Sequence, residues 1–121
     1  MNTIIKSIEE WVSLPELPIA RISAPQERGS VYAVSKVGMV IVDVIDCLRI
    51  GITDVKPLHG NQTALPIVTV NIDGESKLYR LPVLLGSWAF DMCAFAHQGT
   101  NLLPEQVEFS DLNGRITAEM N

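Results

Sequence analysis

The chain has 121 residues, of which 47% are hydrophobic and 19% charged, so it is not a disordered chain and fits one domain over residues 1–121. Its net charge of -5 disfavours a nucleic-acid or anionic membrane partner, because clustered cations bind both. The two cysteines, Cys47 and Cys93, lie far apart in apolar segments. We therefore expect reduced thiols in an acidic cytoplasmic protein, not a disulfide-rich secreted one.

The first part of the chain predicts an amphipathic helix over residues 3–13. Ile4, Ile8 and Trp11 recur at the spacing of one helical face, with charged residues on the other side. Glu9 and Glu10 stand where a signal peptide would have its apolar core, which argues against secretion. Prolines then end the helix, and residues 14–23 are expected to form an extended connector or a short edge strand.

A second helix is expected to begin near residue 23 or 30 and to run to Ile50. Gly51 follows as its C-terminal cap. The β-branched residues 40–42 would also fit a strand, but the period and the length of the pattern favour a helix. The apolar residues on its predicted inner face are Ala33, Val37, Val40, Ile41, Val44, Ile45 and Leu48.

Two β-hairpins are predicted farther along the chain. Residues 67–73 alternate apolar and polar side chains, and residues 77–83 form a second apolar-rich run after a short polar turn. Residues 107–110 and 115–120 flank an Asn-Gly turn, a pair that readily supplies positive φ angles. Both segments are therefore expected to pair as antiparallel strands.

A third helix is predicted over residues 84–98, closed by Gly99. The resulting element order, ααββαββ, predicts an α+β fold. We expect an antiparallel sheet of about four to five strands with the helices packed on one face. Residues 81–104 contain one charge but several polar residues and two glycines, so they indicate a helix and a loop, not a membrane span.

Cys93 and His97 are the sharpest catalytic candidates, because they stand four residues apart and share one face of the predicted helix. An imidazole placed there could take the thiol proton and activate the sulfur as a nucleophile. In the alternative, structural interpretation, Cys93 packs as a small apolar residue and His97 meets the last helical carbonyls or solvent. No third orienting residue accompanies the pair, so the sequence favours a protein without catalytic residues.

Four residues are of the types that bind zinc: Cys47, His59, Cys93 and His97. Structural zinc sites usually supply their ligands as close pairs, and only Cys93 and His97 form one. We therefore expect neither a metal nor another cofactor.

The third helix contains the candidate ligand residues. Asp91 is the only charge between residues 81 and 104, and the helix around it is apolar over most of its circumference. Such a helix needs cover on more than one side, either from the second helix or from another subunit. A ligand site, if present, is expected where this helix meets the loop around His59, with Trp88, Asp91 and His97 nearby.

Three classes of function follow. The favoured one is a non-enzymatic, self-associating binding or interaction module, most simply a homodimer, because the predicted apolar surface exceeds what one sheet face can cover. The second is a small-ligand-binding protein with a pocket between helix and sheet. The third is a small enzyme that uses Cys93 and His97. For the first two classes, the partner other than a second copy of the chain would be another protein or a small molecule.

Overall fold

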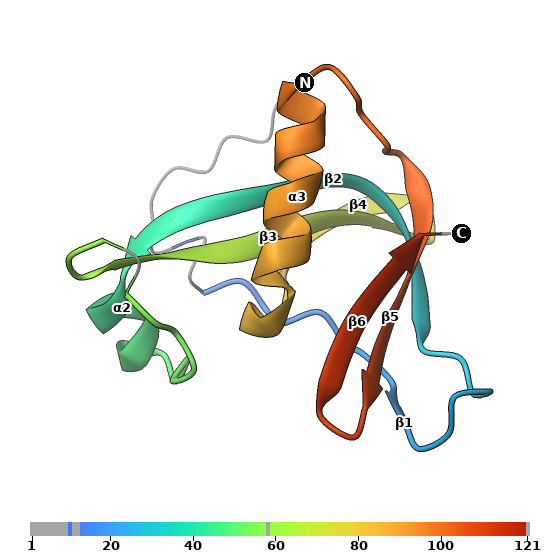
Figure 1. Cartoon of the computed structure of the whole chain (residues 1–121), viewed down its shortest axis with the longest axis horizontal. Coiled ribbons are helices and arrows are strands. Elements are labelled where there is room, and N and C mark those ends of the chain that lie inside the picture. Colours follow the sequence, from blue (N-terminus) through green and yellow to red (C-terminus); the bar gives the residue numbers. More distant parts are fainter. Residues whose placement is uncertain (1–9, 11–12, 58, 121) are drawn as a thin grey trace.

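The computed structural model describes residue 10 and residues 13–57 and 59–120. These residues form a twisted six-stranded sheet with short helical segments (Figure 1). In chain order the elements are β1 (Arg21–Ile22), β2 (Ser30–Asp43), α2 (Val44–Arg49), β3 (Gln62–Ile72), β4 (Glu75–Arg80), the 3-10 turn η1 (Val83–Leu85), α3 (Gly86–His97), β5 (Glu105–Leu112) and β6 (Arg115–Met120).

The strands β2 to β5 are connected as a Greek key. Strands β2, β3 and β4 are consecutive antiparallel neighbours, and α3 carries the chain back so that β5 pairs with β2 on its other side. The antiparallel strand β6 extends the sheet beyond β5, and the two residues of β1 run parallel to the end of β5. The long strand β2 therefore joins the β3–β4 hairpin to the β5–β6 hairpin.

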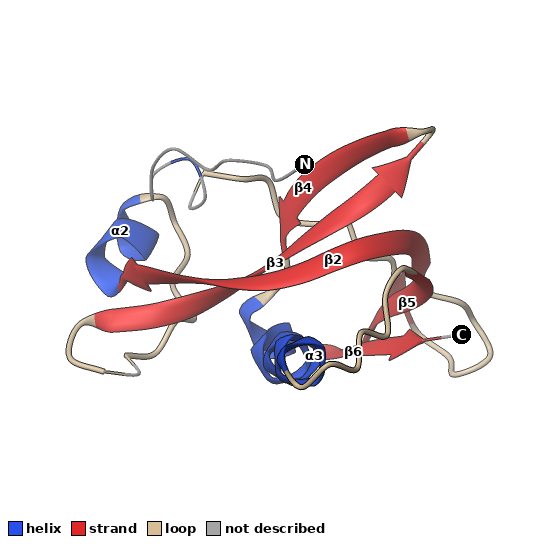
Figure 2. Cartoon of the chain, turned by 90° about the horizontal axis from the view of Figure 1, so that it is seen from above, coloured by secondary structure: helices blue, strands red, loops and turns tan. Residues whose placement is uncertain are grey.

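The sheet carries a hydrophobic core on each face. The larger cluster lies beneath α3 and is built from Val34, Val68, Val70, Val107 and Phe109 of the strands, with Leu17, Leu81 and Leu85. A smaller cluster lies on the opposite face of the β2–β3 ladder, beneath α2, and contains Val42, Leu65, Cys47 and Ile52. Figure 2 shows the two helices on opposite sides of these strands.

The second predicted helix was wrong over most of its length, because residues 30–43 form β2. The helix-like spacing of the apolar residues arises from a β-bulge between Val34 and Lys36, which leaves one extra residue in β2. Val34 and Val37 consequently face the same cluster at a spacing of three residues, as they would on a helix. Beyond Val37 both faces of the strand are apolar, so the alternation typical of a strand is lost. Only residues 44–49 are helical.

The other predicted elements are largely confirmed. Both hairpins are present, with positive φ angles at their turns, and the third helix ends before Gly99 (φ 91°). The connector contributes the edge strand β1. The first predicted helix lies outside the described residues, apart from residues 10 and 13. The predicted antiparallel sheet of four to five strands is confirmed in part. The described sheet has six strands, β1 and β5 pair in parallel, and the helices α2 and α3 lie on different faces.

None of the helices in the described part of the chain is long and apolar enough to span a membrane.

Candidate interaction surface

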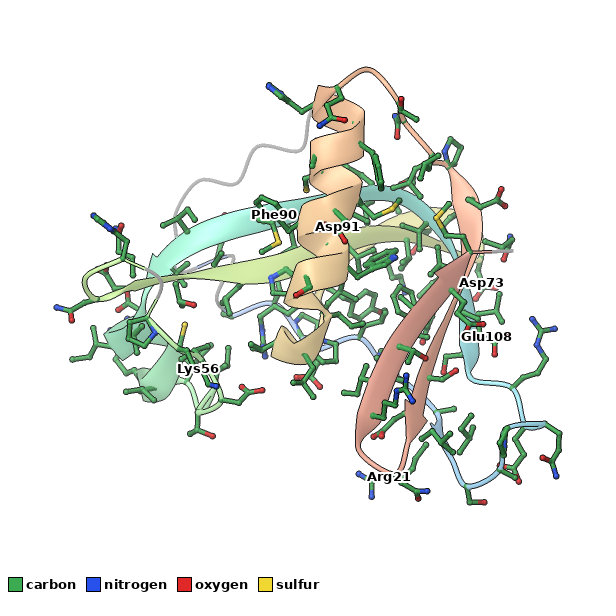
Figure 3. The ribbon with its side chains drawn as sticks, in the orientation of Figure 1. Arg21, Lys56, Asp73, Phe90, Asp91 and Glu108 are labelled. Atoms are coloured by element: carbon green, nitrogen blue, oxygen red, sulfur yellow. The ribbon has the colours of Figure 1, made fainter. Side chains whose placement is uncertain are left out.

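Helix α3 packs on the sheet through a narrow face and leaves both of its flanks exposed. Ala89 and Met92 of α3 are buried, as is Leu85 of η1 just before the helix. Asp91 lies on the side of the helix that faces away from the sheet (Figure 3). The sequence led us to expect that a second helix could cover α3 on another side. Residues 30–43 form β2 instead, and no described element covers α3 there.

The two exposed flanks of α3 are apolar. Phe90 is 64% exposed and lies on the flank that faces the C-terminal half of β2 and α2 (Figure 3). The opposite flank carries Phe95, which is 45% exposed, and Leu84 of η1, just before the helix, is 65% exposed. Large side chains in such positions are typical of protein contact surfaces when other apolar residues adjoin them.

Beside the Phe90 flank, strand β2 has an edge that no other described strand pairs with; we call it the open edge. Its first part, up to Val34, pairs with β5, but the residues from Lys36 to Asp43 pair only with β3 among the described strands. This half of β2 lies to the left of α3 in Figure 1, past the end of β5. An open edge of this kind is a template for pairing with another strand.

Two backbone hydrogen bonds show which residues of β2 face the open edge. The Val44 N–H, just past the strand, donates to the Asn61 carbonyl (2.8 Å), so the even-numbered residues here bond toward β3. Pro66, the partner of Met39, accepts from the Leu81 N–H (2.9 Å) and is thus turned away from β2. By this alternation the N–H and C=O groups of Met39, Ile41 and Asp43 point outward.

Side chains along this edge are apolar and accessible. Ile41 is 54% exposed and, through its pairing with Ala64, lies on the same sheet face as Val37 and α3. Val40 lies on the opposite face and packs against the smaller core cluster. Lys36 and Asp43 are the charged residues of this half of β2 and stand at its two ends. The stretch between them has neither a charge nor a proline, the features that commonly block edge pairing.

The catalytic candidate Cys93 lies on the side of α3 that contacts β2. Its Sγ donates a hydrogen bond to the Val37 carbonyl (3.6 Å), the one outward-facing carbonyl of this half of β2 that α3 reaches among the described residues. Burial raises the pKa of the Cys93 thiol, which favours the protonated form. His97 is exposed at the end of α3. This geometry suits packing better than nucleophilic chemistry.

The structure separates His59 from the other three predicted ligand residues. Trp88 stacks edge-on against Phe109 with ring centroids 5.7 Å apart, while Asp91 and His97 are exposed on α3. His59 lies in the turn before β3, whose first residue pairs with Asp43. Asp43 is six residues from the Cys93 contact at Val37, or roughly 20 Å along the strand. A ligand contact at Trp88, Asp91 or His97 stays a prediction.

The four zinc candidates are likewise dispersed. Cys47 is fully buried on the inner side of α2. Burial first and the Asp46 charge second raise the pKa of its thiol, against a smaller opposite effect of Arg80. Within the described residues no three histidine, cysteine or acidic side chains are grouped so that they could hold a metal ion.

The sequence interpretation missed Met39, Ile41 and the rest of the edge, because it placed them in a helix. The signal that was present, the β-branched run at residues 40–42, indicated a strand but could not show which of its sides lacks a partner. Comparison with known proteins adds no further guide: neither a family model, nor a curated protein, nor a solved structure matches the chain.

Proposed function

We propose that this protein is a non-enzymatic, self-associating interaction module, most simply a homodimer. The observation that supports it best is the joint exposure of Phe90 on α3 and Ile41 on β2, on one face of the sheet. Burying an apolar side chain of this size gains about 1.5–3 kcal/mol. A second subunit would supply the cover for α3 that the chain itself does not.

Charge favours an association of this kind over binding to a polyanion. The chain is acidic overall, and among the described residues Arg21, Arg28 and Arg49 are in ion pairs with carboxylates of the same chain. The acidic residues give the protein a net charge that keeps it soluble, while the uncharged stretch of β2 leaves a path for close approach.

Sedimentation equilibrium over a range of concentrations tests the proposal. The wild-type protein is expected to approach twice its monomer mass of 13.3 kDa at tens of micromolar. Phe90→Ser is expected to weaken the dimer at least tenfold. Leu84→Ser is the matched control, since Leu84 is as exposed but lies in η1, which contacts β6 and β3. A wild-type protein that stays at 13.3 kDa at all concentrations would refute the proposal.

A further inference from the structure

We infer that two copies of the chain pair through the open edge of β2, in antiparallel register centred on Ile41, to form one continuous sheet. This inference rests on the proposed self-association and specifies its geometry. It starts from the three outward-facing residues of the edge: Met39, Ile41 and Asp43.

The register follows from symmetry. Antiparallel neighbours related by a two-fold axis perpendicular to the sheet keep matching faces on the same side. Centring the axis on Ile41 places Ile41 opposite the partner's Ile41 and Met39 opposite the partner's Asp43. Each of the three outward residues then meets another outward residue, so every free N–H and C=O of this stretch gains a partner. A centre on Val40 would instead pair Asp43 with Val37, whose carbonyl already accepts the Cys93 thiol.

The position of α3 limits how far the pairing between the two β2 strands can extend. The Val37 carbonyl already accepts the Cys93 thiol, and α3 crosses β2 at that point. A register centred nearer to Val37 would bring the end of the partner's strand against the helix. The pairing centred on Ile41 stops at Met39 and avoids this contact.

Side chains on the paired edge favour a second copy over an unrelated strand. On the α3 face the axis brings the two Ile41 side chains together, and it places both Phe90 flanks on that face. The two Asp43 carboxylates lie four residues apart along the strands, about 13 Å, so their repulsion is largely screened. The edge is short, and we expect a dissociation constant in the micromolar range.

Disulfide crosslinking tests the register of the two β2 strands directly. In Ile41→Cys the two cysteines would form a hydrogen-bonded pair with Cα atoms about 5.5 Å apart, within the range that a disulfide spans. Val40→Cys is the matched control: its two copies would be about 8 Å apart, too far for a disulfide. Both variants are oxidised with copper phenanthroline and run on a non-reducing gel beside the wild type, which reports the background from Cys47 and Cys93.

The expected result is a covalent dimer from Ile41→Cys in at least tenfold excess over Val40→Cys and the wild type. If sedimentation shows a wild-type dimer but Ile41→Cys gives no excess, the register is wrong while the self-association stands. If Val40→Cys crosslinks instead, the axis passes through Val40 and the inference is likewise overturned. If the wild type is monomeric, the proposed function itself fails. Ile41→Pro, which removes an outward N–H without breaking the β3 ladder, should abolish the dimer with an unchanged circular dichroism spectrum.

Discussion

Phe109→Ala should be among the most destabilising single substitutions in the larger core. Phe109 is fully buried at the centre of the cluster beneath α3. Its ring contacts Trp88 edge-on at 5.7 Å and Tyr32 at 6.2 Å between centroids. Removing a buried phenyl ring costs about 3–5 kcal/mol, through lost transfer free energy and the cavity left behind. The loss of the two aromatic contacts places the expectation in the upper half of that range.

This loss is large beside the free energy of unfolding of a domain of this size, which is about 5–15 kcal/mol. With a urea dependence of about 2 kcal/mol/M, the unfolding midpoint should fall by roughly 2 M. The assay is urea unfolding followed by tryptophan fluorescence, to which Trp88 contributes as a direct neighbour of Phe109, and in parallel by far-UV circular dichroism.

Phe90→Ala is the matched control, because it removes the same ring from a position that is 64% exposed. Measured at about 0.1 µM, well below the dissociation constant expected for the dimer, it should change the free energy of unfolding by less than about 1 kcal/mol. Equal losses for the two variants would show that Phe109 is not the centre of the core and would refute the reasoning.

Two further predictions concern the segment before β2. Gly29→Ala should destabilise the fold, because a Cβ there would overlap the Phe109 carbonyl oxygen. Gly86→Ala is the comparison: it has open space in the first turn of α3 and should be neutral or stabilising by up to about 1 kcal/mol in the same urea assay. The Gly29 N–H and the Arg28 guanidinium lower the pKa of Glu108. Glu108→Gln should therefore cost stability above the ordinary pKa of 4.5, and the difference from wild type should vanish as the pH falls below the lowered value. Glu119→Gln, at the position opposite Glu108, is the control, and a loss in this variant with the same pH dependence would contradict the assignment to Glu108.

Local turn chemistry made the two hairpins and α3 predictable. Asp73 and Asn113 adopt positive φ angles (54° each) and are followed by glycines, which is what the turn sequences indicated. Gly99 ends α3 in the same left-handed region, and the Thr100 N–H donates to the Phe95 carbonyl (2.8 Å). These signals depend on a few adjacent residues, so they can be recognised without knowledge of the rest of the fold.

The candidate surface depends on long-range pairing and could not be predicted in the same way. The bulge at residue 35 gave β2 the spacing of a helix, and the cover on both faces removed its alternation. Even a correct strand prediction would not reveal that β5 stops pairing at Val34. The exposure of Phe90 could be predicted in part. A helix that is apolar over most of its circumference exposes some large side chain when only one of its sides is covered.

The pairing of β2 with β5 has a consequence for synthesis of the chain. Ser30 pairs with Phe109, so the two strands are roughly 80 residues apart in sequence. At a ribosomal rate of about 5–20 residues per second, β2 waits about 4–16 seconds for its partner. During that interval the edge that β5 will later cover is open along with the edge of residues 36–43. The nascent chain is thus most prone to aggregation at β2, and slower growth at low temperature, with abundant chaperone, should raise the yield of native protein.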